Sequence, residues 1–89
     1  MSKQRFTLNQ HIVCGEHLKD CIESIEHTIT NITNSFPVSS PHVRESLSAL
    51  QVAKRKLILA SSEMEEVMFD DFRDAPINAY FGQRLSGES

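Results

Sequence analysis

The sequence lacks long hydrophobic runs, and no apolar stretch approaches the ~20 residues that a membrane-spanning helix needs. Its first ten residues, MSKQRFTLNQ, contain no hydrophobic signal region. The chain carries a formal net charge of −3, so no overall attraction draws it to nucleic acid or to a membrane surface. These absences argue against a membrane span, and duplex nucleic acid is not an expected partner.

Cysteine is scarce, with only Cys14 and Cys21. The two lie on one predicted helix, about 10 Å apart along its axis, so a disulfide between them would require the helix to break. We therefore expect a reducing, cytoplasmic setting. The chain has no internal repeat and no low-complexity segment, and we expect residues 1–89 to form a single small domain.

The strongest periodic pattern runs from Pro41 to Phe69. Its apolar residues recur at spacings of three and four, or their sums, which is typical of a helix packed along a partner helix. They are Val43, Leu47, Leu50, Leu57, Met64 and Met68. Lys54 and Ser61 are polar positions in the same stripe. Lys54 must therefore extend to solvent, pair with a carboxylate or meet a ligand anion.

A second, shorter stripe on the same helix consists of Val52 and Leu59, roughly opposite the first. A two-helix hairpin needs only one apolar stripe per helix. A chain this short rarely builds a secure core alone, and oligomerisation is one common remedy. The second stripe therefore suggests a homo-oligomer.

The first half of the chain predicts another helix, over residues 7–36. Thr7 or Asn9 can cap its start, and Pro37 ends it. Gly15 indicates a kink near that position or a close approach by another segment. The apolar stripe that follows has the same three-four spacing and comprises Leu18, Ile22, Ile25, Ile29, Ile32 and Phe36.

A short link joins the two helices. Ser40 followed by Pro41 is a helix start signal, with the proline at the first helical position, and the second helix is expected over residues 40–74. Long helices joined by a short link are antiparallel neighbours. The sequence therefore predicts an all-α antiparallel two-helix hairpin, with a kinked first helix and a short C-terminal extension over residues 75–89.

This pairing has two consequences for side chains. It places Lys54 near Glu23 and Glu26, on the other helix. It also leaves Tyr80 and Phe81, in the tail, to dock either on the hairpin or on a neighbouring subunit.

His11, Cys14, His17 and Cys21 resemble metal ligands at first sight. Their spacing, H-x2-C-x2-H-x3-C, is not that of a zinc finger, and four ligands on one helix cannot wrap a tetrahedron. Cys14 and Cys21 are expected on the same helix face as Leu18, Ile22 and Ile25, where cysteine acts as a small hydrophobe, so no metal or other cofactor is expected. No nucleophile elbow, Gly-rich loop or acid-base pair is recognisable, and an enzyme is not expected.

Two charged features remain. A dense acidic run near the end of the second helix fits either a solvated face or a surface that docks on a basic protein; it comprises Glu63, Glu65, Glu66, Asp70, Asp71 and Asp74. Lys19 follows Gly15 by one turn, and a glycine-lysine pair suits a phosphate. The alternative for Lys19 is a surface ion pair with Glu16 or Glu23.

The segment ESLSALQVAKRKLILAS, from Glu45 to Ser61, resembles the second helix of a known family: spaced leucines, an aliphatic-Ala-basic step, then K-L. Leu18-Lys19-Asp20 resembles the aliphatic-Lys-acidic step of that family's first helix. The family is the small phage helical-hairpin group of cyclic-nucleotide sponges. It blocks CBASS, cyclic-oligonucleotide antiphage signalling, and an anti-Thoeris sponge shares its hairpin. The two segments and the chain between them, residues 18–61, span about half of the sequence.

The resemblance implies a homo-oligomer, typically a hexamer, that sequesters cyclic di- or trinucleotides in the host cytoplasm without cleaving them. Lys19 matches a basic position that contacts a cyclic dinucleotide, and Lys54 matches the basic residue of the second helix. Phe6 is the nearest candidate for the aromatic residue that stacks on a base. The alternative hypothesis is an acidic helical module that masks a basic surface of a host protein.

Overall fold

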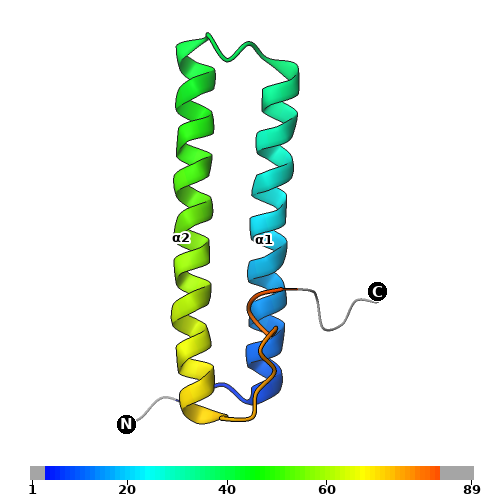
Figure 1. Ribbon diagram of the computed structural model, residues 1–89, viewed down its shortest axis with the longest axis vertical. Helices are drawn as coiled ribbons and strands as arrows, with labels where there is room; N and C mark the ends of the chain where they lie inside the picture. The colour runs from blue at the N-terminus through cyan, green and yellow to red at the C-terminus, as the bar shows by residue number, and fades with distance from the viewer. Residues whose placement is uncertain (1–3, 83–89) are drawn as a thin grey trace.

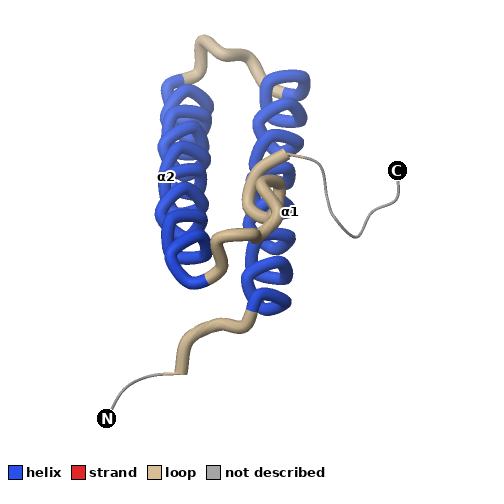
Figure 2. Tube along the Cα trace, turned by 60° about the horizontal axis from the view of Figure 1, so that its bottom comes forward, coloured by secondary structure: helices blue, strands red, loops and turns tan. Residues whose placement is uncertain are grey.

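The computed structural model describes residues 4–82. It contains two long helices, α1 (Leu8–Ser35) and α2 (Pro41–Asp71), which lie side by side and run in opposite directions (Figure 1). Residues 4–82 include no strand, so the all-α hairpin prediction is confirmed. After α2 the chain turns back and residues 72–82, which we call the strap, cross the lower part of α1 (Figures 1 and 2).

The helix ends follow the expected signals closely. Thr7 caps α1: its hydroxyl accepts from the Gln10 N–H at 3.1 Å, and the Gln10 amide oxygen accepts from the Thr7 N–H at 2.8 Å. Pro41 stands at the first position of α2. The predicted range 40–74 extends past the observed end at Asp71, because Phe72 adopts an extended backbone that stops the helix.

The sequence offers two explanations for Gly15, a kink in the helix or a close approach by another segment. Helix α1 continues through Gly15, and the structure does not show the expected kink. The close approach is real: a Cβ built on Gly15 would lie 1.9 Å from the backbone oxygen of Ala79. Glycine at this position therefore lets the strap backbone rest directly on α1.

The predicted apolar stripes face each other along the hairpin. The stripe positions of α1 from Leu18 to Ile32 are half-buried, and so are those of α2, where Ser61 and Met68 are fully buried. Val52 and Leu59 are exposed, as expected for a second stripe opposite the first. One chain alone leaves much of the seam near the turn partly open to solvent.

The best-buried core lies at the other end, beneath the strap. Met68, Ala75, Ala79 and Tyr80 are buried there. Within the single chain, Tyr80 and Phe81 thus dock on their own hairpin, which is one of the two alternatives that the sequence leaves open for them. The partly buried residues packed around this core are Leu8, Ile12, Cys14, Leu18, Met64, Phe69, Phe72 and Phe81.

Ser61 carries a cost within the seam. It is fully buried, and its hydroxyl has no hydrogen-bond partner within residues 4–82. Removing an unsatisfied hydroxyl relieves its desolvation penalty, and alanine is the better helix former. We expect Ser61→Ala to raise the free energy of unfolding by about 1 kcal/mol.

Urea denaturation at unchanged m-value would measure this gain. Ser62→Ala is the matched control, because Ser62 is exposed and its replacement by alanine changes helix propensity alone. A Ser61→Ala gain no larger than that of the control would show that the hydroxyl costs nothing.

Candidate functional site

A cavity of about 610 Å³ lies where α1, α2 and the strap meet. Its volume is within the range of small-molecule sites. We call it the lysine cavity, since the two lysines singled out by the sequence both line it. Its lining residues are Lys19, Ile22, Glu23, Glu26, Lys54, Ile58, Tyr80, Phe81 and Gly82.

Lys54 enters the cavity from α2. Its ammonium nitrogen lies 2.8 Å from a carboxylate oxygen of Glu26 on α1, which confirms the expected pairing across the hairpin. Glu23, the other predicted neighbour, also lines the cavity. The Lys54 side chain keeps 30% exposure and that of Glu26 keeps 52%, so this ion pair is open to solvent and to a competing anion.

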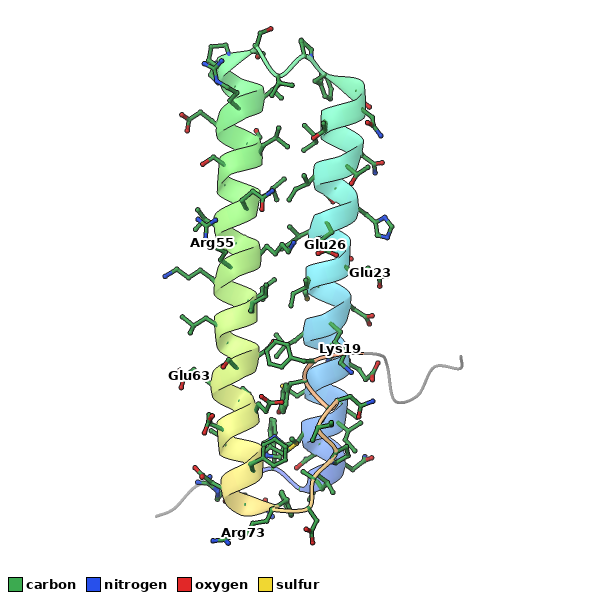
Figure 3. The ribbon with its side chains drawn as sticks, viewed as in Figure 1. Lys19, Glu23, Glu26, Arg55, Glu63 and Arg73 are labelled. Atoms are coloured by element: carbon green, nitrogen blue, oxygen red, sulfur yellow. The ribbon has the colours of Figure 1, made fainter. Side chains whose placement is uncertain are left out.

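Lys19 reaches the cavity from α1, and Figure 3 places it beside the strap. Its ammonium group donates to the backbone oxygen of Asn78 at 2.6 Å and lies 3.6 Å from a Glu16 carboxylate oxygen. The pair with Glu16 is one of the alternatives that the sequence leaves open. The side chain is only 10% exposed, however, so Lys19 is not a surface lysine. It fastens the strap to α1.

The charge on the cavity wall is balanced. Two ammonium groups face two carboxylates, those of Glu23 and Glu26. An anionic ligand would have to compete with Glu26 for Lys54. The same ligand would also contact Phe81, whose aromatic ring is a surface on which a flat base can stack. The arrangement offers binding groups for a phosphate and for a ring.

Phe6 lies elsewhere. It lines a second cavity, of about 280 Å³, together with Arg5, His11 and Asp71. Within one chain Phe6 therefore does not join Lys19 and Lys54, and its contact with a ligand stays a prediction that needs a second subunit. Two other aromatic residues, Tyr80 and Phe81, do line the lysine cavity.

His11, which is buried, forms the centre of an aromatic cluster beside this second cavity. Its Nδ1 lies 2.6 Å from the Tyr80 hydroxyl, and the rings of Phe6, Phe72 and Tyr80 meet it edge-on. Its Nε2 is buried and has no partner among residues 4–82. Burial lowers the pKa of His11, and burial together with nearby Cys14 raises the pKa of Tyr80.

Arg5 and Asp71 close the rim of the second cavity. The Arg5 Nε donates to a carboxylate oxygen of Asp71 at 2.6 Å. This hydrogen bond and the opposite charge raise the pKa of Arg5. The pair joins the N-terminal arm to the end of α2 next to the buried His11 cluster.

The histidines and cysteines of α1 that resemble metal ligands do not gather. The structure shows no group of three or more His, Cys, Asp or Glu side chains able to hold an ion within the described part of the chain. His11 is engaged with Tyr80, while His17 and Cys21 are exposed. Cys14 packs against the core as predicted, but Cys21 does not, because it lies on the solvent side of α1.

The acidic run is mostly exposed. Glu63, Glu66, Asp70 and Asp74 are open to solvent, whereas Glu65 is half-buried. Neither helix of the structure, over residues 4–82, is long and apolar enough to cross a membrane.

No known protein family, curated protein or solved structure matches the chain. The function must therefore be argued from the site itself.

Proposed function

We propose that the protein is a phage-type immune-evasion protein that binds cyclic oligonucleotide second messengers and sequesters them without cleavage. The supporting observation is that Lys19 and Lys54, from different helices, line one cavity with Phe81. Phosphate oxygens accept charge-assisted hydrogen bonds from lysine, and bases stack on aromatic rings. These are the two groups that every cyclic oligonucleotide presents.

The proposal includes assembly into a homo-oligomer, typically a hexamer in the family it resembles, in the host cytoplasm. The cavity is partly open to solvent, so a neighbouring chain could complete it. Phe6 precedes α1 and is 41% exposed, and it would then stack on a base of the nucleotide bound in the cavity of the next subunit. Sequestration needs only tight binding at high copy number, and it calls for no catalytic group.

The ion pair between Lys54 and Glu26 supplies a test with effects of opposite sign. Lys54→Gln removes the charge that would hold a phosphate, and we expect it to weaken binding of the retained cyclic nucleotide about tenfold. Glu26→Gln removes the competing carboxylate, and we expect it to strengthen binding. Arg44→Gln, which removes a positive charge at an exposed position of α2 outside the cavity, is the matched control.

The ligand should first be identified by native mass spectrometry with a mixture of cyclic di- and trinucleotides and cyclic ADP-ribose isomers. Isothermal titration would then compare the three variants. Lys19→Ala should also weaken binding while the oligomer stays intact, although it frees the strap as well, so its effect is larger and less specific. Retention of no nucleotide, or equal affinity in Lys54→Gln and Glu26→Gln, would contradict the proposal.

A second candidate function is supported by the exposed acidic run. Four of its carboxylates face solvent near the end of α2, where they could mask a basic surface of a host protein. Neutralising Glu63, Glu66, Asp70 and Asp74 together should abolish that activity and leave nucleotide binding unchanged. The opposite pattern would favour the nucleotide sponge.

A further inference from the structure

The outward side of α2 carries a stripe that the fold of one chain does not use. We call it the outer stripe and define it by Val52, Arg55, Lys56, Leu59, Glu63 and Glu66, all of which are exposed. Figure 3 shows Arg55 and Glu63 projecting from the side of α2 that faces away from α1. Leu59 is 52% exposed and Val52 is 42% exposed, so apolar surface lies between the charges.

The order of charges along this stripe is distinctive. Leu59 stands in the middle, the basic residues precede it and the acidic residues follow it. Arg55 and Glu63 are each four residues from Leu59, which is about 6 Å along a helix axis. Val52 and Glu66 are each seven residues away. A two-fold axis through Leu59 would therefore superimpose the basic half of one stripe on the acidic half of another.

We infer that the outer stripe is an isologous interface on which a second copy of this chain packs its own α2 in the antiparallel direction. Leu59 meets Leu59 at the two-fold axis, and Arg55 of each chain lies opposite Glu63 of the other. Lys56 lies within reach of the same glutamate. An isologous contact is self-complementary by symmetry, and the charge order of this stripe satisfies that condition.

The charges also select the direction of packing. In a parallel pair each residue would face its own copy, which sets Arg55 against Arg55 and Glu63 against Glu63. Like charges in direct opposition are destabilising. Helix α2 extends to Asp71, so an antiparallel pair centred on Leu59 overlaps over positions 47–71 and remains helical throughout.

This interface gives a specific surface to the self-association proposed above, and it does not depend on nucleotide binding. Lys54 lies on the opposite side of α2, in the seam. Two chains joined through their outer stripes would therefore keep both lysine cavities accessible. A ligand-binding defect and an assembly defect can be separated by experiment.

Charge reversal tests the inference directly. Arg55→Glu alone and Glu63→Arg alone each create two like-charge pairs in the homodimer, and we expect each to raise the dimer Kd at least about tenfold. The two single variants mixed in equal amounts should form a heterodimer, because every pair across that interface is then of opposite sign. The double variant should also recover self-association.

Analytical ultracentrifugation, at concentrations up to about 100 µM and at low and high salt, would measure these states, since surface pairs weaken with ionic strength. Arg44→Glu is the matched control, because it makes the same charge change at an exposed position of α2 outside the overlap. A monomeric wild-type protein, single variants that associate as well as wild type, or a mixture that fails to recover would each overturn the inference. Nucleotide titration of the same variants would show separately whether the proposed function survives.

Discussion

Replacing Gly15 by alanine is expected to detach the strap from the hairpin. The added Cβ would lie 1.9 Å from the Ala79 oxygen, a distance at which the strap backbone must move. Alanine gains about 1 kcal/mol of helix propensity over glycine. That gain is outweighed if Tyr80 and the residues beside it lose their burial, since a fully buried large side chain contributes about 1.5–3 kcal/mol.

We expect a net loss of about 2 kcal/mol in the free energy of unfolding, which for a domain of this size lowers Tm by roughly 10 °C. Thermal and urea unfolding would measure the loss. Tyrosine fluorescence reports the strap itself, because Tyr80 is the only tyrosine and the chain has no tryptophan. In Gly15→Ala, Tyr80 should become accessible to a soluble quencher.

Asn31→Ala is a suitable control for this substitution, since it introduces alanine at an exposed position of α1 far from the strap. It should leave quenching of Tyr80 unchanged. If Gly15→Ala proved as stable as the wild type and kept Tyr80 protected, the strap would not rest on Gly15 as the structure has it.

The hairpin can be predicted because the residues that specify it recur at regular spacings along the sequence. Apolar residues at three-four spacing define one face of each helix, and Pro37 and Pro41 mark the link between the helices. A short link fixes the register of two antiparallel helices, and for this reason the amino-acid pattern alone places Lys54 near Glu26. The observed pair at 2.8 Å follows from that register.

The strap is not predictable in the same way. Besides the Tyr80 side chain, two contacts hold it on α1: Ala79 rests on Gly15, and a backbone carbonyl accepts from Lys19. Neither leaves a periodic pattern. A single glycine within a helical pattern fits a kink as well as a close approach, and only the position of the strap distinguishes them.

The same limit applies to the candidate site. Helix pairing places Lys54 near Glu23 and Glu26, but Lys19 is a candidate through its place after Gly15 and the family resemblance, so the cavity that both lysines line is not predicted. The aromatic side of the cavity comes from the strap, and no helical pattern indicates where Phe81 docks. Phe6 is a candidate because of its place in the sequence, but the fold directs it to the His11 cluster instead.

We expect His11 to make the attachment of the strap dependent on pH. Burial is the main cause that lowers its pKa; Arg5 lowers the pKa further, and Asp71 opposes both. The charged groups facing it are thus Arg5 from the N-terminal arm and Asp71 from α2, with the neutral Tyr80 hydroxyl from the strap. With Nδ1 accepting from the Tyr80 hydroxyl, the neutral ring carries its proton at Nε2, so protonation would occur at Nδ1 and remove the acceptor of that hydrogen bond.

The sign follows from the two states of the chain. The unfolded chain binds a proton on His11 near its ordinary pKa of about 6.5, whereas the folded chain resists protonation until a lower pH. Stability is therefore complete above about pH 6.5 and falls as the pH decreases toward the folded-state pKa, by up to about 1.4 kcal/mol per pH unit.

Urea denaturation between about pH 7.5 and 5, followed through Tyr80 fluorescence, would measure this slope. His11→Gln is the informative variant: its amide oxygen can still accept from the Tyr80 hydroxyl, but the side chain does not titrate. We expect it to lose most of the pH dependence in this range. His17, His27 and His42 are exposed, so His17→Gln serves as the control and should keep the wild-type slope. If the slopes of the wild type and His11→Gln were equal, groups other than His11 would govern the stability of the strap at acidic pH.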